Sequence, residues 1–414
     1  MASKYQAPRG TFDVLPEQAR SRARLERVAA GIFARAGYEP IATPVFEDTA
    51  LFERGVGQST DIVRKEMFTF EDKGERSLTL RPEGTASICR AYLEHGMHKL
   101  AQPVKLSYLG PFFRHERPQA GRYRQFHQLG IECIGTDSPL ADAEAIMLLS
   151  DLLAELGVPG VELRLGSLGS LEARKAYLED LKAHLHAHEG DLSKDVRERI
   201  DINPLRAFDA DDEGTRGVMA SAPTIVGRLE GEDAEHFEAV KALLDAAGIA
   251  YVVDPTLVRG LDYYTRTIFS FVCSALGAQS EIGGGGRYDG LVEQLGGAST
   301  PAVGFAAGIE RILLALDEEV PAAGRDAFVA VADPGQRERA MALAVELRHA
   351  GLSAEVDLAG RALKGQLKHA DRLGARRVLI LEADGGAQLR DMGTGEQRPA
   401  DPGKLLDEMT GDDS

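Results

Sequence analysis

SYLGPFFRHERPQAGRYRQFHQLGIECIG, at residues 107–135, predicts two strands joined by a basic loop. Alternation from Val104 to Phe113 favours the first strand. The loop contains Pro118 and Gly121, which are turn formers. Its charged residues are Arg114, Arg117, Arg122, Arg124 and one acid, Glu116. The basic residues gather at one end of the hairpin, where a polyanion could bind.

The second strand of this hairpin has two chemically different faces. Because side chains alternate along a strand, one face carries Phe126, Gln128, Gly130 and Glu132. The other face carries Gln125, His127, Leu129, Ile131 and Cys133. A hairpin with a solvated face is the simpler interpretation, but it would leave Phe126 in water. We therefore interpret the first face as the floor of a site for a planar, phosphate-bearing ligand.

Length and composition indicate a globular protein of more than one domain. The 414 residues are too many for one hydrophobic core, so two or three domains are expected. Apolar and charged contents of 43% and 27% are typical of soluble proteins. The apolar runs are too short to span a bilayer, and the N-terminal residues MASKYQAPRG lack a signal-peptide core. We expect a cytoplasmic protein that does not enter a membrane.

Charge and cysteine content exclude further classes. The net charge of −17 argues against a protein that coats nucleic acid through bulk charge. Residues 361–377, in contrast, hold six basic residues and one acid, and they form a local basic patch. Cys89, Cys133 and Cys273 are scattered without paired spacing. They predict neither a disulfide framework nor a zinc site, and buried apolar positions suit them best.

The pattern of expected helices and strands divides the chain into a core, an inserted module and a second domain. We expect the first domain at residues 1–325, with a mostly helical insertion at about 167–248. Residues 326–414 alternate strand and helix, which predicts a small α/β domain. In the first domain we expect a strand at 279–283. Another is expected at 41–46, where a proline restricts it to an edge, a bulge or an interface.

Two segments with glycine precede expected helices. EIGGGGRYDGL, at 281–291, resembles a phosphate loop only superficially, since no Gly-Lys-Ser/Thr ends it. Its glycines would allow a ligand close to the backbone, and tight strand packing is the alternative. LRPEGTA, at 80–86, places Glu83, Gly84 and Thr85 at a helix start. An acid there complements the helix dipole, but it could also meet an ammonium group.

Two further segments carry arginines suited to anions. LVRGLDYYTRTIFSF, at 257–271, contains Arg259, whose forked donors could reach a carboxylate or phosphate. The paired tyrosines beside it are more often core or interface residues. AVGFAAGIERILLAL, at 302–316, places Arg311 in the first turn of a helix, where a cation does not complement the dipole. A nearby polyphosphate would explain that placement.

All these segments, in this order, resemble the histidyl-tRNA synthetases, a class II aminoacyl-tRNA synthetase family, over nearly the whole chain. GYEPIATPVFED at 37–48 resembles the first class motif, residues 110–132 the second and 302–316 the third. Residues 257–266 and 280–291 are similar to two segments particular to the histidine enzymes. The resemblance implies an α+β core, in which helices flank a mostly antiparallel sheet, with a helical insertion. It also implies a C-terminal α/β anticodon-binding domain and a homodimer with Pro44 at its interface.

The resemblance implies a histidine–tRNA ligase that uses ATP as substrate, with Mg²⁺ held mainly by the ATP phosphates and no metal site of its own. The implied catalytic residues are Arg259, Arg114 and Arg311. The implied histidine-binding residues are Glu83, Gly84, Thr85, Arg114, Gln128, Glu132, Arg259, Tyr263, Tyr264 and Tyr288. The implied ATP-binding residues are Arg114, Glu116, Phe126 and Arg311. Arg117 and Gln119 are implied to contact tRNA(His).

Two other functions compete with this interpretation. Relatives of these enzymes serve as non-catalytic, histidine-binding regulatory subunits of ATP phosphoribosyltransferase, and they usually lack the C-terminal domain and an intact arginine–tyrosine segment. Here Arg259, Tyr263, Tyr264 and residues 327–414 are all present. A generic nucleotide-binding protein is the other alternative, against which the loop arginines and the basic patch at 361–377 argue. One departure from the family lies at LEADGGAQL, 381–389, where a Gly-Glu-x-Glu turn is common.

Overall fold

The computed structural model describes residues 5–57, 60–277, 280–317, 320–401 and 404. The chain forms two compact units, Met1–Val320 and Pro321–Ser414, which we describe separately. In this described part of the chain, no helix is long and apolar enough to cross a membrane. All three cysteines are buried and free, as predicted.

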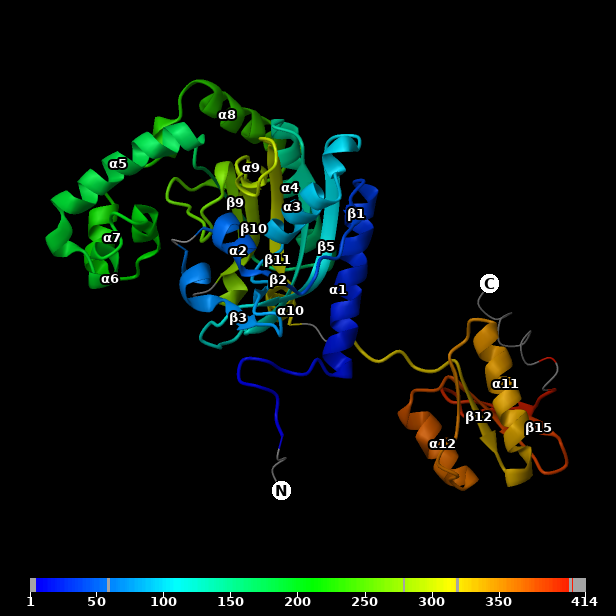
Figure 1. Ribbon diagram of the computed structural model, residues 1–414. Coiled ribbons are helices and arrows are strands. Elements are labelled where there is room, and N and C mark those ends of the chain that lie inside the picture. Colours follow the sequence, from blue (N-terminus) through cyan, green and yellow to red (C-terminus); the bar gives the residue numbers. More distant parts are fainter. Residues whose placement is uncertain (1–4, 58–59, 278–279, 318–319, 402–403, 405–414) are drawn as a thin grey trace. The chain divides into compact units, whose positions relative to one another are not determined.

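The first unit is built on an eight-stranded sheet (Figure 1). Its strands, in spatial order, are β1 (Glu39–Pro40), β5 (Val104–Phe113), β6 (Gln125–Ile134), β11 (Ala302–Gly308), β10 (Glu281–Arg287), β9 (Thr265–Cys273), β7 (Val161–Ser167) and β8 (Val252–Val253). The outermost pair at each edge is parallel, and the five pairs between them are antiparallel. The predicted mostly antiparallel α+β core is therefore confirmed.

Helices cover both faces of this sheet. One face packs against α1 (Pro16–Arg35), α4 (Pro139–Leu156), α8 (Gly231–Ala246) and α10 (Ile309–Leu316). The other face packs against α3 (Thr85–Glu94) and α9 (Leu291–Gln294). Local sequence explains where α4 begins and ends. Pro139 lies in its first turn, Ser138 caps it by accepting the Leu140 N–H, and Gly157 ends it in the left-handed conformation.

The hairpin at 107–135 forms as predicted, and β5 matches its predicted bounds. The register pairs Tyr108 with Gly130 and Phe112 with Phe126. On β6, Leu129, Ile131 and Cys133 are buried in the core formed with α1 and α4, so the predicted division of faces is confirmed.

The strand predicted at 41–46 is wrong. The chain instead leaves the large sheet after β1 and joins a small sheet at β2 (Phe46–Asp48). Pro40 and Pro44 lack the N–H that a continuous ladder needs, which explains the break. The small sheet also contains β3 (Phe68–Glu71) and β4 (Ser77–Leu80).

The glycine run is a central strand, not a loop before a helix. The strand was expected to begin at Gln279, which lies outside the described residues, and to end at Gly283, but β10 continues to Arg287. A Cβ on Gly285 would lie 2.0 Å from the Gly304 carbonyl oxygen, so glycine permits close approach of β11. Packing in the middle of the sheet therefore outweighs the low strand propensity of glycine.

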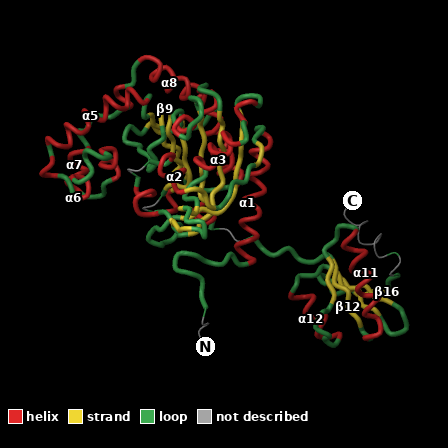
Figure 2. The backbone as a smooth tube through the Cα atoms, in the orientation of Figure 1, coloured by secondary structure: helices red, strands yellow, loops and turns green. Residues whose placement is uncertain are grey.

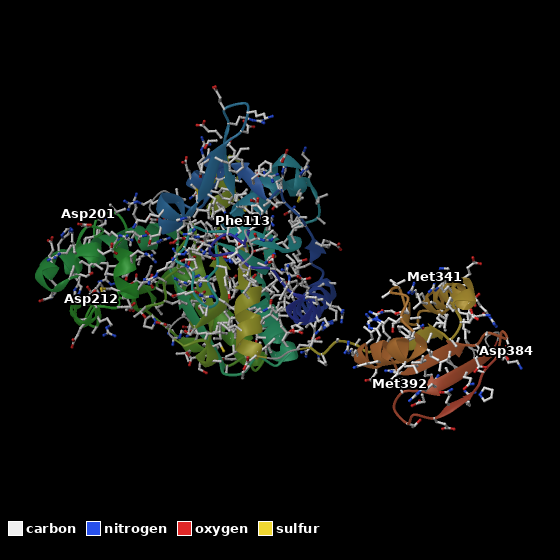
Figure 3. All side chains as sticks on the ribbon, turned by 90° about the horizontal axis from the view of Figure 1, so that it is seen from below. Phe113, Asp201, Asp212, Met341, Asp384 and Met392 are labelled. Carbon is white, nitrogen blue, oxygen red and sulfur yellow. The ribbon has the colours of Figure 1, made fainter. Side chains whose placement is uncertain are left out.

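A helical module occupies the region where the insertion was expected. It includes α5 (Leu171–Ala187), α6 (Lys194–Arg197) and α7 (Glu213–Met219), which pack around their own apolar core. Figure 1 shows α5, α6 and α7 to one side of the sheet. Asp201 and Asp212 mark its outer part in Figure 3, whereas Phe113 lies at the end of β5, among densely packed side chains.

Two ion pairs join this module to the rest of the unit. Asp61 lies 3.3 Å from Arg199 and 2.7 Å from Arg206. Asp61 precedes a π-helical turn, Ile62–Glu66, which follows α2 (Thr49–Gly55) along the chain.

The second unit is a five-stranded sheet between two helices (Figure 2). Its strands, in spatial order, are β13 (Ala354–Val356), β12 (Ala327–Val331), β14 (Arg377–Leu381), β15 (Ala387–Asp391) and β16 (Gln397–Pro399). The helices α11 (Arg337–His349) and α12 (Leu363–Arg372) pack on opposite faces. The predicted α/β alternation is confirmed. The antiparallel strands β15 and β16 were missed, because they are short and follow a loop of glycine and aspartate.

Candidate active site

A cavity of about 530 Å³ lies on the sheet face that carries Phe126 and Gln128. We call it the central pocket. The expected site residues that line it are Glu83, Gly84, Thr85, Arg114, Glu116, Phe126, Gln128, Arg259, Tyr263, Tyr264, Tyr288 and Arg311. They come from β6, α10, the start of α3, the hairpin loop, the segment before β9 and the residue that follows β10. Arg117 and Gln119 are exposed on the hairpin loop and are not among the lining residues.

Glu132 lies buried beside these lining residues. The Tyr288 hydroxyl donates to one carboxylate oxygen at 2.5 Å, and the Thr85 hydroxyl donates to the other at 2.7 Å. Burial raises the pKa of Glu132 to about 8, although these two hydrogen bonds act in the opposite direction. A Cβ on Gly304 of β11 would lie 1.9 Å from the Glu132 carboxylate. Glycine at 304 therefore makes room for this acid within the sheet.

Glu83 stabilises the start of α3 and also faces the pocket. Its carboxylate accepts the backbone N–H groups of Thr85 at 2.7 Å and Ala86 at 2.9 Å. Burial raises the pKa of Glu83 above its usual value, against the effect of these N–H groups. Glu83 thus lies at a helix start, where an acid complements the helix dipole, as predicted. The Tyr263 hydroxyl, 3.4 Å away, places an aromatic ring beside the same carboxylate.

The hairpin loop places an arginine over an aromatic ring. The Arg114 guanidinium carbon lies 5.4 Å from the centre of the Phe126 ring, and its Nε donates to the Pro82 carbonyl at 2.9 Å. Glu116 lies between Arg122, at 3.5 Å, and Arg114, at 4.0 Å. An aromatic face and arginines therefore share one end of the pocket, as the alternation of β6 predicted.

Two more arginines reach the pocket from other elements. Arg311 on α10 donates from Nε to the Gly121 carbonyl at 3.1 Å and from Nη1 to the Glu281 carbonyl. Arg259 forms an ion pair with the Glu281 carboxylate, and its guanidinium carbon lies 5.7 Å from the Tyr264 ring. Arg114, Arg122 and Arg206 also line the cavity, so it has five guanidinium groups in all. Such a lining suits a ligand with several negative charges.

Several buried polar atoms around the pocket have no hydrogen-bond partner within the described part of the chain. They are Gln128 Oε1, the Tyr108 hydroxyl and Arg259 Nε. An unpaired buried polar atom is costly unless something satisfies it. A polar ligand in the pocket would meet this need. Among the described residues, no three His, Cys, Asp or Glu side chains are grouped so that they could hold a metal ion.

Sequence reasoning missed several lining residues, among them Glu66, Tyr108, Asp209 and Glu281. The hairpin register could have identified Tyr108, since it lies directly opposite Gly130. A Cβ on Gly130 would lie 2.5 Å from the Tyr108 hydroxyl, so the glycine makes room for this ring. Glu66 and Asp209 reach the pocket from the π-helical turn and the insertion. No periodic pattern signals residues that are placed by packing between such distant segments.

Comparison with known proteins agrees with this geometry. Residues 10–312 match the family model of the histidyl-tRNA synthetases, and residues 326–411 match an anticodon-binding domain. The histidine–tRNA ligase of Thermosynechococcus vestitus is 48% identical over 409 residues, which cover 97% of this chain and 96% of that protein.

Solved structures show the same similarity. The apo histidyl-tRNA synthetase of S. aureus has a TM-score of 0.83 and 36% identity, covering 98% of this chain and 99% of that one. A Bacillus halodurans protein, described as an ATP phosphoribosyltransferase regulatory subunit/histidyl-tRNA synthetase, has a TM-score of 0.67 and 25% identity. The match covers 92% of this chain and all of that protein. From its fold, its pocket and these matches, the chain belongs to the histidyl-tRNA synthetase family.

Proposed function

We propose that this protein is a histidine–tRNA ligase. Buried Glu132 carries the proposal, because Tyr288 and Thr85 hold this carboxyl beside a pocket lined by five arginines. A carboxyl in that place can recognise an imidazole ring through hydrogen bonds. Readout of a ring N–H rejects analogues that lack it, because their binding leaves buried polar groups unpaired.

The first step joins histidine to AMP. A carboxylate oxygen of histidine attacks the α-phosphorus of ATP, the bond to the bridging oxygen breaks, and pyrophosphate leaves with its electron pair. Because the nucleophile is already an anion, positioning and charge stabilisation supply the catalysis. Arg114 and Arg259 act at the α-phosphate, with Arg259 also at the histidine carboxylate, and Arg311 acts at the γ-phosphate.

The second step transfers histidine to tRNA. A ribose hydroxyl at the 3′ end attacks the carbonyl carbon of the adenylate and loses its proton as the ester forms. The acyl–phosphate bond breaks, and AMP leaves with its electron pair. Exposed Arg117 and Gln119 contact the acceptor end. In the second unit, the basic residues of 361–377 contact phosphates near the anticodon and position the tRNA without reading sequence.

The pocket divides between the two small substrates. Glu83, Gly84, Thr85 and Gln128 bind the α-ammonium group of histidine, for which Gln128 Oε1 offers a buried acceptor. Glu132 and Tyr264 bind the imidazole, and Tyr263 and Tyr288 close the site. Phe126 stacks on adenine beside Glu116. Mg²⁺ accompanies ATP and is held mainly by the phosphates.

The assembly and the domain roles belong to the same proposal. Residues 1–325 catalyse, with the insertion at 167–248, and residues 326–414 bind the anticodon region. The protein acts as a homodimer in the cytoplasm, where tRNA is charged. Exposed apolar side chains near the first class motif, Val45, Phe46 and Phe70, support a protein interface there. Sedimentation of the wild type and of Phe46→Glu tests the dimer, which the charge should weaken.

An exchange assay followed by a charging assay tests the function. Exchange of labelled pyrophosphate into ATP should require histidine, and labelled histidine should then appear on tRNA(His). Exchange with a different amino acid would overturn the proposal. Binding of histidine without exchange or charging would favour a regulatory subunit instead.

A further inference from the structure

Glu281 is the first residue of β10 and contacts two arginines of the central pocket. Its carboxylate forms the ion pair with Arg259, and its backbone carbonyl accepts a hydrogen bond from Arg311. Neither the sequence motifs nor the proposed steps assign this acid a role. Among the described residues, and with no ligand bound, Glu281 supplies the carboxylate that contacts Arg259 directly.

The strand around Glu281 is shaped to hold this ion pair. A Cβ on Gly284 would lie 2.5 Å from the Phe269 carbonyl oxygen of β9, 2.9 Å from Arg259 Nη1 and 3.0 Å from Glu281 Oε1. Glycine at 284 therefore permits close pairing with β9 and also leaves the space in which guanidinium and carboxylate meet. A site built around the pair indicates that the contact belongs to the folded pocket.

The two partners differ in their access to solvent. The Arg259 side chain is 15% exposed, whereas that of Glu281 is 44% exposed. Arg259 Nε also has no partner among the described residues. Arg259 is thus held in place with one N–H donor unpaired among the described residues. The Glu281 side chain, in contrast, has room to turn toward water. An incoming anion could take over the guanidinium without leaving Glu281 buried and unpaired.

The surrounding charges keep Glu281 ionised. Burial would raise the pKa of Glu281, but Arg259, together with Arg311 and a hydrogen bond from Ser270, lowers it below its usual value. Asp209 of the insertion also faces this pair. When an anionic substrate binds Arg259, these acids therefore either move away from the arginine or stay and repel the substrate.

We infer that Glu281 is an exchangeable counter-ion. It positions Arg259 in the empty pocket and yields it to the carboxylate of histidine. The inference rests on the proposed function, because it takes histidine as the incoming anion. Displacing Glu281 from Arg259 costs free energy when the histidine carboxylate binds, and this cost is similar in the bound state and in the transition state. Removal of the acid should therefore lower KM without changing kcat.

Calorimetry with two ligands tests this exchange. Histidine carries the carboxylate, and histidinol has a hydroxymethyl group in its place. For Glu281→Gln, histidine should bind about three- to five-fold more tightly than to wild type, the upper part of the range for a partly exposed charge pair. Histidinol affinity should stay within about two-fold, because it does not need Arg259. In pyrophosphate exchange, KM for histidine should fall by the same factor as Kd.

Matched variants separate charge from structure. Glu281→Asp keeps the charge and should retain the wild-type ratio of histidine to histidinol affinity. Glu162→Gln removes a similarly exposed partner of Arg164 on β7, and it should change the affinity for neither histidine nor histidinol. If Glu281→Gln folds poorly, Glu281→Ala takes its place with the same expected ratio.

Two results would overturn the inference. One is weaker histidine binding in Glu281→Gln, which would mean that Glu281 stays paired in the complex. The other is an equal change for both ligands, which would indicate a purely structural role. Wild-type protein that binds neither ligand would overturn the proposed function as well, so the two failures are distinguishable.

Discussion

Strand β10 has an arginine–carboxylate pair at each end, and the two pairs differ in what surrounds them. At its end, Arg287 is fully buried and contacts Asp142 at 2.6 Å and Asp289 at 3.1 Å. It also donates to two backbone carbonyls. At its start, Glu281 and Arg259 face the pocket, and Arg259 keeps an unused donor. The satisfied pair joins β10 to α4, whereas the incomplete pair retains capacity for a ligand.

Breaking the buried pair should have the largest effect. Arg287→Met preserves much of the side-chain volume but leaves Asp142 buried without its main cation. We expect the unfolding free energy of the first unit to fall by about 3–5 kcal/mol. Chemical denaturation followed by circular dichroism measures this change. Arg259→Met is the matched control, and an equal loss in both variants would contradict the contrast between the two ends.

Breaking the pocket pair should affect activity instead of stability. Arg259→His should reduce histidine-dependent pyrophosphate exchange by about 10²- to 10³-fold, as loss of one charge-stabilising donor does. Its melting temperature should stay close to that of wild type, because Arg259 faces a cavity. Exchange kinetics and thermal melting provide the two measurements. A fully active variant would remove Arg259 from the mechanism.

The same contrast explains what could be predicted from sequence. Alternation placed Phe126, Gln128 and Glu132 on one face of β6, because the two-residue period of a strand holds whatever its neighbours are. Arg287 and Asp142, in contrast, lie 145 residues apart, and no local pattern links them.

Only the start of β10 was expected to be a strand, and tight strand packing of the glycine run was left as an alternative, for a related reason. Its glycines lack a strand signature, and they become a strand because β9 and β11 pack closely on either side. The pairing of Glu281 with Arg259 depends on that packing. Family resemblance supplied the chemistry of the pocket, while these contacts appear only in the folded chain.

Glu132 is a buried acid that has no arginine partner among the described residues, and it extends the comparison to the pH dependence of stability. Burial raises the pKa of Glu132 from 4.5 to about 8, so between these values the folded protein binds one proton more than the unfolded chain. Stability from this group is complete below pH 4.5 and is lost as pH rises through about 8. Relative to Glu132→Gln, wild type should lose up to about 1.4 kcal/mol per pH unit in that window. Melting curves from pH 5 to 9 without ligand test this, and parallel curves for the two proteins would contradict it.

The smallest effect is expected where both partners of a pair reach solvent. Arg164 and Glu162 on β7 lie 3.1 Å apart, with side chains 46% and 49% exposed. Water competes for both charges, so Glu162→Gln should change the unfolding free energy by less than about 1 kcal/mol. Denaturation under the conditions used for Arg287→Met measures the difference. A loss as large as that of Arg287→Met would mean that burial does not decide what such a pair contributes. A small loss would show that an arginine–carboxylate pair has different effects in different places. Depending on how many of its hydrogen bonds the protein satisfies, such a pair stabilises the sheet, binds a ligand or contributes little to stability.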